Sequence, residues 1–83
     1  MNVTLHPHAE QRMAERGAKR DEIIETVVSG ELFLAKFDRT GFRKNFNFND
    51  YWNKKLYATK QIEAYCVSEN NNWLVITILV KYF

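Results

Sequence analysis

The sequence predicts an α+β domain in which two N-terminal helices pack on a four-stranded, mostly antiparallel sheet. Proline and glycine mark the ends of two helical segments within the first 30 residues. After Gly30 the pattern changes to alternation with many aromatic and β-branched residues, which is typical of strands. Helices followed by strands indicate the α+β class. The 83 residues suffice for one modest core, so we expect a single domain over residues 1–83.

The first helix is expected over residues 7–16, because Pro7 suits a first turn and Gly17 suits the left-handed residue after a helix. A second helix is expected from about Asp21 to Ser29, with acids in its first turn and Gly30 as its end. Lys19 occupies the place of its usual Ser or Thr cap. The spacing predicts a buried stripe on this helix formed by Ile23, Ile24, Val27 and Val28.

Four strands are expected, over residues 31–37, 42–48, 56–67 and 73–82. In the second, alternation places Phe42, Phe46 and Phe48 inward and Arg43, Asn45 and Asn47 outward. We expect a turn at Asn49-Asp50 and a hairpin at Asn70-Asn71-Asn72, because Asn tolerates left-handed backbone angles. The last strand is apolar on both sides, which favours a central position, with Thr77 on the same face as Val75 and Leu79.

The net charge of +2 is unevenly distributed, since residues 33–60 hold most of the lysine and arginine and eight of the twelve aromatic residues. Basic and aromatic side chains together favour RNA, because cations attract the backbone and rings stack on unpaired bases. Arg43, Lys44 and Lys60 are candidate substrate-binding residues. Lysines on an outer sheet face are also commonplace, and most rings must fill the core, leaving one or two of Tyr51, Trp52 and Tyr57 facing solvent.

His8, Arg12 and Arg16 recur every four residues, which places them on one face of the first helix. In one interpretation the arginines bind phosphate and His8 transfers a proton, the two services that RNA cleavage needs without a metal. The alternative is a solvated helix face, which the spacing alone favours. Assay separates the two.

Other chemistries have little support in the sequence. There are two histidines and no Cys-x-x-Cys or paired acidic cluster, so we expect no metal, and the lack of a glycine-rich phosphate loop predicts no nucleotide cofactor. Cys66, the single cysteine, is expected in the core, and it fits a cytoplasmic location. No segment reaches the length of a membrane helix or has a signal-peptide core, so we expect no membrane partner.

The segment from His8 to Gly17, with Asp21-Glu22-Ile23 and Ser29-Gly30-Glu31, resembles the opening of the DUF4258 family. Residues 73–77, Trp-Leu-Val-Ile-Thr, are similar to its closing strand. The resemblance implies a fold related to RelE/ParE-like and barnase-like small toxins and nucleases, and with it metal-independent RNA cleavage. It carries over His8, Arg12, Arg16 and Thr77 as catalytic residues. In a RelE-like site, Lys81 or Tyr82 would assist phosphate binding or proton transfer.

We therefore expect a toxin-like, metal-independent ribonuclease with RNA as substrate and a cognate antitoxin or other protein as partner. Two alternatives stay open on the sequence. One is a module that binds nucleic acid or protein without turnover, such as an inhibitor or regulator. The other is a ParE-like toxin that acts on a protein target.

Overall fold

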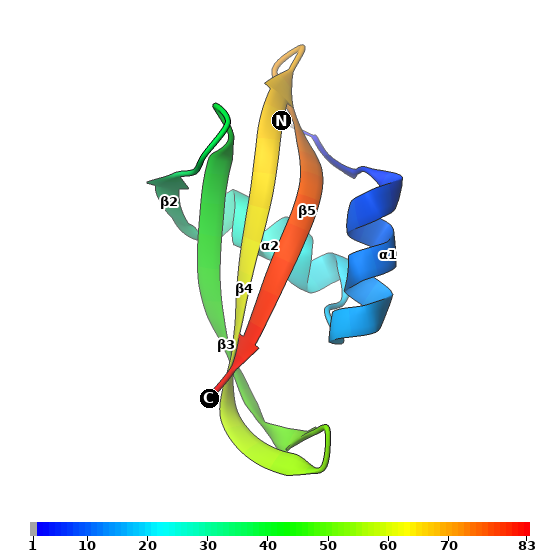
Figure 1. Ribbon diagram of the computed structural model, residues 1–83. Coiled ribbons are helices and arrows are strands. Elements are labelled where there is room, and N and C mark those ends of the chain that lie inside the picture. Colours follow the sequence, from blue (N-terminus) through cyan, green and yellow to red (C-terminus); the bar gives the residue numbers. More distant parts are fainter. Residues whose placement is uncertain (1) are drawn as a thin grey trace.

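The computed structural model describes residues 2–83, which form two helices packed on one face of a five-stranded mixed sheet (Figure 1). In the sheet the strands lie in the order β1-β5-β4-β3-β2. The elements in chain order are β1 (Val3–Leu5), α1 (Pro7–Arg16), α2 (Arg20–Ser29), β2 (Glu31–Leu34), β3 (Thr40–Trp52), β4 (Lys55–Glu69) and β5 (Asn72–Tyr82). The predicted α+β class is confirmed, with one strand more than expected.

α1 has the predicted bounds, and both of its ends are capped. At the start, the imidazole Nδ1 of His6 accepts a hydrogen bond from the backbone N–H of His8 at 3.0 Å. At the end, Gly17 takes a left-handed φ of 75° and its N–H bonds to the carbonyl of Met13. His6 is therefore the residue that caps the helix, a place where Ser, Thr, Asp and Asn are more usual.

α2 begins one residue earlier than predicted, with Lys19 as its N-cap. The carboxylate of Glu22 accepts a hydrogen bond from the backbone N–H of Lys19 at 2.9 Å. This contact is the glutamate half of a capping box, which compensates for the missing Ser or Thr. The predicted stripe holds at Ile23 and Val27, whereas Val28 is 71% exposed.

The long hairpin of β3 and β4 reaches beyond the helices (Figure 1). Its turn lies at Asn53 and Lys54, where φ is 50° and 68°. The predicted turn at Asn49-Asp50 was wrong: β3 continues through these residues, and the register shift between Asn47 and Asp50 marks a bulge there. Asn49 has the left-handed φ of a turn residue, 48°, which a bulge also accommodates. The preference of Asn49 for a left-handed φ was therefore taken to indicate a turn, whereas it belongs to a bulge.

The hairpin of β4 and β5 turns at Asn70 and Asn71, with φ of 51° and 64°, as the asparagine run predicted. The central strand is β4, however, and not β5. The outer side of β5 pairs in parallel with β1, which the sequence analysis missed, only over residues 73–75. A three-residue strand carries too short an alternation to be recognised, and its partner lies at the other end of the chain.

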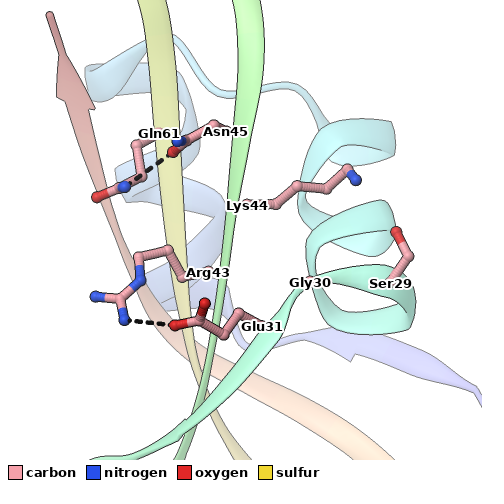
Figure 2. A pocket seen from close by; sticks show the side chains of 7 residues that line it. All are labelled: Ser29, Gly30, Glu31, Arg43, Lys44, Asn45 and Gln61. Carbon is pink, nitrogen blue, oxygen red and sulfur yellow. Dashed lines mark hydrogen bonds and ion pairs between the residues drawn. The ribbon is translucent and has the colours of Figure 1, made fainter.

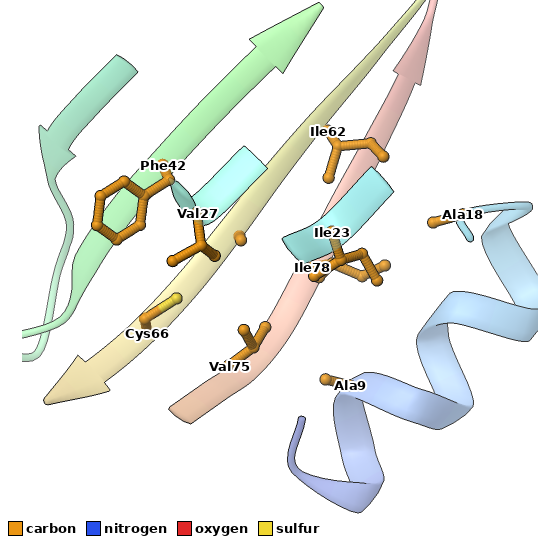
Figure 3. Close-up of a cluster of buried hydrophobic side chains, with 10 residues drawn as sticks. Ala9, Ala18, Ile23, Val27, Phe42, Ile62, Cys66, Val75 and Ile78 are labelled. Atoms are coloured by element: carbon orange, nitrogen blue, oxygen red, sulfur yellow. The ribbon is translucent and has the colours of Figure 1, made fainter. Parts of the chain in front are cut away.

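The core lies between the two helices and the sheet (Figure 3). Ile23 and Val27 of α2 point toward the middle strands, and Ala9 of α1 points toward β5. The buried apolar residues are Ala9, Ala18, Ile23, Val27, Phe42, Ile62, Ala64, Cys66, Val75 and Ile78. The helices thus cover one face of the sheet and leave the other, here called the open face, without a covering layer.

Candidate functional site on the open face of the sheet

The open face presents polar and aromatic side chains in rows that cross the strands. Because cross-strand partners point to the same side of a sheet, the register assigns each row. The first row contains Phe33, Gly41, Tyr65 and Thr77; the second contains Glu31, Arg43, Glu63 and Leu79; the third contains Asn45, Gln61 and Lys81. Three predicted site residues, Arg43, Thr77 and Lys81, therefore share this face.

A bulge decides the position of Thr77. The register of β4 and β5 shifts between the pairs Tyr65–Thr77 and Cys66–Val75. Since Tyr65 and Cys66 point to opposite faces, Thr77 and Val75 do so too, and the expectation that they share a face was wrong. Val75 is fully buried under the helices, whereas Thr77 lies on the open face. The extra residue in β5 reverses the alternation from that point on.

The centre of the second row is Glu63, a glutamate with only 4% of its surface exposed. Its Oε1 accepts a hydrogen bond from the Tyr65 hydroxyl at 2.8 Å. Its Oε2 lies 3.4 Å from Nη1 of Arg43 and 3.5 Å from Nζ of Lys81. Glu63, Arg43, Tyr65 and Lys81 are called the Glu63 cluster below. A buried carboxylate needs such partners, because desolvation alone disfavours its charge.

The cations of the Glu63 cluster are accessible although the carboxylate is not. The side chain of Arg43 is 36% exposed and that of Lys81 is 59% exposed. Arg43 also pairs with Glu31 at 3.0 Å, and this hydrogen bond raises the pKa of its guanidinium. Burial raises the pKa of the Tyr65 hydroxyl, and the neighbouring Glu63 adds to that effect. Tyr65 is therefore a neutral donor at physiological pH.

Figure 2 shows the edge of the sheet where this face begins. Arg43 reaches Glu31, and Gln61 donates to the side-chain oxygen of Asn45 at 2.8 Å, both on the side away from α2. Lys44 extends the opposite way, toward α2. A polar hollow of about 350 Å³ lies between these side chains and the end of α2. Of the basic pair Arg43-Lys44, only Arg43 belongs to the open face.

The predicted helix site does not form a pocket with the open face. His8 is exposed on α1, and Arg12 pairs with Glu15 at 2.7 Å, a contact that lowers the pKa of that carboxyl. Arg16 donates from Nη1 to the carbonyl of Ile78 at 2.5 Å. That carbonyl lies on the stretch of β5 beyond its pairing with β1, so Arg16 satisfies part of an otherwise unpaired strand edge.

Lys60 and Tyr82 lie under the turn between the helices, on the helix-covered face. Nζ of Lys60 donates to the carbonyl of Gly17 and pairs with Glu22, both at 2.7 Å, and the residue is 3% exposed. The Tyr82 hydroxyl donates to the carbonyl of Arg16 at 2.7 Å. Burial raises the pKa of Tyr82, and the charge of Glu22 adds to it. These two side chains cap the last carbonyls of the first helix.

The fold therefore divides the predicted residues into three groups. Arg43, Lys81 and Thr77 share the open face, His8, Arg12 and Arg16 remain on α1, and Lys44, Lys60 and Tyr82 point to the helix side. Glu63 and Tyr65 were not among the site residues expected from the sequence. Their signal was faint: Glu63 is an acid flanked by Ile62 and Ala64, which the alternation sends to the opposite face from those two apolar residues.

A family model described as a domain of unknown function, DUF4258, matches residues 5–80. The chain belongs to the DUF4258 family. The match runs from the last residue of β1 to Val80 in β5, and so includes the whole Glu63 cluster except Lys81. No curated protein and no solved structure matches the chain.

Within residues 2–83, no three His, Cys, Asp or Glu side chains gather in a group that could hold a metal ion. Neither α1 nor α2 is long and apolar enough to cross a membrane. Cys66 is fully buried as expected, and burial raises the pKa of its thiol to about 12.

Proposed function

We propose that this DUF4258 protein is a metal-independent ribonuclease that works on the open face of its sheet, with the Glu63 cluster as the active site. One observation carries the proposal. Glu63 is 4% exposed on a face that no helix covers, and two cations and a tyrosine hydroxyl lie within 3.5 Å of it. A base beside accessible phosphate-binding cations is the combination that cleavage of RNA without metal requires.

The geometry supports a role for each member of the cluster. Glu63 Oε2 has the longer contacts, 3.4 and 3.5 Å. When the substrate phosphate draws the exposed side chains of Arg43 and Lys81 away from it, this oxygen is uncovered and takes the ribose 2′-OH proton. The 2′-oxygen then bonds to phosphorus as the bond to the 5′-oxygen breaks, which leaves a 2′,3′-cyclic phosphate. Arg43 stabilises the charge on the phosphorane. The ammonium of Lys81, the most exposed group, supplies the proton to the leaving 5′-oxygen.

Tyr65 holds the base in place in this scheme. Its hydroxyl occupies Oε1 of Glu63 at 2.8 Å, so the carboxylate presents Oε2 to the substrate. The raised pKa of Tyr65 keeps that hydroxyl protonated at neutral pH. The proposal keeps the reaction class that the family resemblance implied, and it keeps Arg43 and Lys81 from the sequence-predicted residues. It replaces the α1 residues as the catalytic group.

The test is cleavage of a pool of single-stranded RNA by the purified protein in excess chelator. We expect a Glu63→Gln variant to lose about 100-fold or more in cleavage rate, the usual contribution of a general base. The matched control is Glu69→Gln, at the exposed end of the same strand, which should cleave at the wild-type rate. Product mass should show the cyclic phosphate.

The same assay separates the two candidate sites. A double variant, His8→Ala with Arg12→Ala, should retain activity if the open face is the site, whereas an α1 site requires that it be lost. Absence of cleavage by the wild-type protein on the whole pool would reject the ribonuclease proposal. In that case a non-catalytic module or a toxin with a protein target, bound in the cell by an antitoxin-like partner, takes its place.

A further inference from the structure

We propose that a groove next to the Glu63 cluster binds an unpaired nucleobase, which would make single-stranded RNA the substrate class of the site. The groove holds about 440 Å³, a volume within the range of ligand-binding pockets. Its lining includes Phe33, Phe37, Tyr65, Leu79, Lys36 and Arg39, and it is called the Phe33 groove below. Binding of the base does not depend on the proposed function. The inference that a phosphate next to this base is cleaved rests on the proposed function.

The groove and the cluster are contiguous. Tyr65 lines the groove and donates its hydroxyl to Glu63, and Leu79, also in its lining, is the cross-strand partner of Glu63. Arg43 of the cluster also contacts Phe33 of the groove, because its guanidinium carbon lies 4.7 Å from the centre of the ring. A nucleotide whose base lies in the groove would therefore place its own phosphate, or the next phosphate along the strand, beside the cations of the Glu63 cluster.

The position of the Phe33 ring in the groove depends on one glycine. The Phe33 ring lies over Gly41, where an added Cβ would come within 2.3 Å of a ring atom. The ring meets Tyr65 edge to face, with centroids 5.8 Å apart and planes at 87°. Phe33 is therefore held in place by its neighbours and forms a fixed part of the groove lining.

The outer wall is different, because Phe37 is 86% exposed. It follows β2 in a tight turn where Phe37 and Asp38 both take left-handed angles, φ of 62° and 57°. Such a conformation is costly for a bulky residue, and glycine or asparagine would hold the turn at lower cost. Strained backbone that presents a large ring to solvent is a feature that marks binding sites.

Charge complementarity selects the occupant. Lys36 and Arg39 line the groove together with its apolar side chains, and the lining includes no acidic residue. An aromatic slot with a cationic rim suits a base that carries its phosphates, because stacking tolerates any sequence while the cations bind the backbone. Duplex RNA cannot enter in this way, since its bases are stacked on one another.

The experiment measures binding of a short RNA strand with 2′-O-methyl riboses, which lacks the nucleophile and stays intact. By fluorescence anisotropy, wild-type protein should prefer this strand to its duplex. Phe37→Ala should weaken binding of the strand about tenfold, as expected for one lost stacking contact. Tyr51→Ala removes a ring of similar exposure, 66%, on the distant hairpin and should have no effect.

Two further measurements identify the base as the ligand. For an abasic strand of the same length, wild-type protein and Phe37→Ala should bind equally. Lys36→Gln should lower the slope of log affinity against log salt by about 0.7, the value for one phosphate contact on a single strand. Phe37→Ala should leave that slope unchanged.

Equal affinity of Phe37→Ala and Tyr51→Ala for the strand would overturn the inference, and the exposed apolar wall would then fit a protein partner. This failure differs from failure of the ribonuclease proposal. If the wild-type protein binds the strand through Phe37 but cleaves no RNA, the groove proposal stands and the ribonuclease proposal is rejected. A protein that cleaves RNA at the Glu63 cluster regardless of Phe37 does the reverse.

Discussion

β4 carries two buried charges three residues apart, and the two faces of the sheet treat them differently. Lys60 is 3% exposed under the helices and Glu63 is 4% exposed on the open face. The contacts of Lys60 are short, 2.7 Å to Gly17 and to Glu22, and they join the helix turn to the sheet. The contacts of Glu63 with the cations Arg43 and Lys81 are longer, at 3.4 and 3.5 Å. Both of these cations are exposed to solvent.

This difference teaches how to separate a structural charge from a chemically available one. Both residues satisfy the rule that a buried ion has partners. The partners of Lys60 include the backbone carbonyl of Gly17 at a helix end, a group that has no partner within its own helix. The cations at Glu63 are exposed side chains, which a phosphate can contact without disturbing the core. Burial alone would have ranked the two sites equally.

The largest effect on stability should come from Lys60→Met. The substitution removes the side-chain donor to the Gly17 carbonyl and the cation paired with Glu22, which keeps its hydrogen bond from the Lys19 backbone N–H. We expect a loss of about 3 kcal/mol in the free energy of unfolding. Urea denaturation followed by circular dichroism measures it. Lys36→Met, on the exposed turn after β2, is the control and should change stability by less than about 0.5 kcal/mol.

Glu63→Gln should cost less, about 1 to 2 kcal/mol, because the amide oxygen still accepts from Tyr65 and Arg43 keeps its pair with Glu31. The same denaturation assay applies. A loss of stability as large as that of Lys60→Met would show that Glu63, like Lys60, is a structural charge, and that the two faces of the sheet do not differ in this respect. A small loss with abolished cleavage would sharpen the distinction between the faces.

Cys66→Ala probes the helix-covered face by pH. The thiol has a pKa of about 12 in the folded protein and near 9 when unfolded, so the unfolded chain ionises first and stability falls as pH rises above 9. At neutral pH the variant should lose about 1 kcal/mol for the missing sulfur. Above pH 9 the gap between wild type and variant should narrow, and a constant gap would contradict the assignment.

The smallest effect is expected for Arg12→Ala on α1. Its ion pair with Glu15 is exposed on both sides, so removal should change the free energy of unfolding by less than about 0.5 kcal/mol. Arg16→Ala is the comparison variant and should cost more, because Arg16 donates to the β5 backbone. Equal effects of the two variants would mean that the strand edge needs no covering side chain.

Local signals predicted much of the fold. The bounds of α1 follow from Pro7 and Gly17, and the second hairpin follows from the asparagines at 70 and 71, because these residues restrict or widen their own backbone angles. The alternation of β3 around Phe42 was correct for the same reason: a strand period can be read within a few residues.

The candidate site depended on information that no local window holds. His8, Arg12 and Arg16 do lie on a helix as their spacing predicted. In the fold, however, Arg16 donates a hydrogen bond to the carbonyl of Ile78, on a strand edge 62 residues away. Arg43 and Lys81 were identified as cations, but their convergence on Glu63 requires three strands in one particular register. The bulge in β5 then moved Thr77 to this face and Val75 to the other.

The sequence by itself determined the α+β class, the bounds of α1, the buried position of Cys66 and the basic, aromatic character of the middle of the chain. The tertiary structure alone decided which strand lies at the centre, the pairing of β1 with β5 and the burial of Glu63 among cations. The physical reason is range. Backbone preference and period act between neighbours, whereas register and bulges are settled by pairing with distant strands.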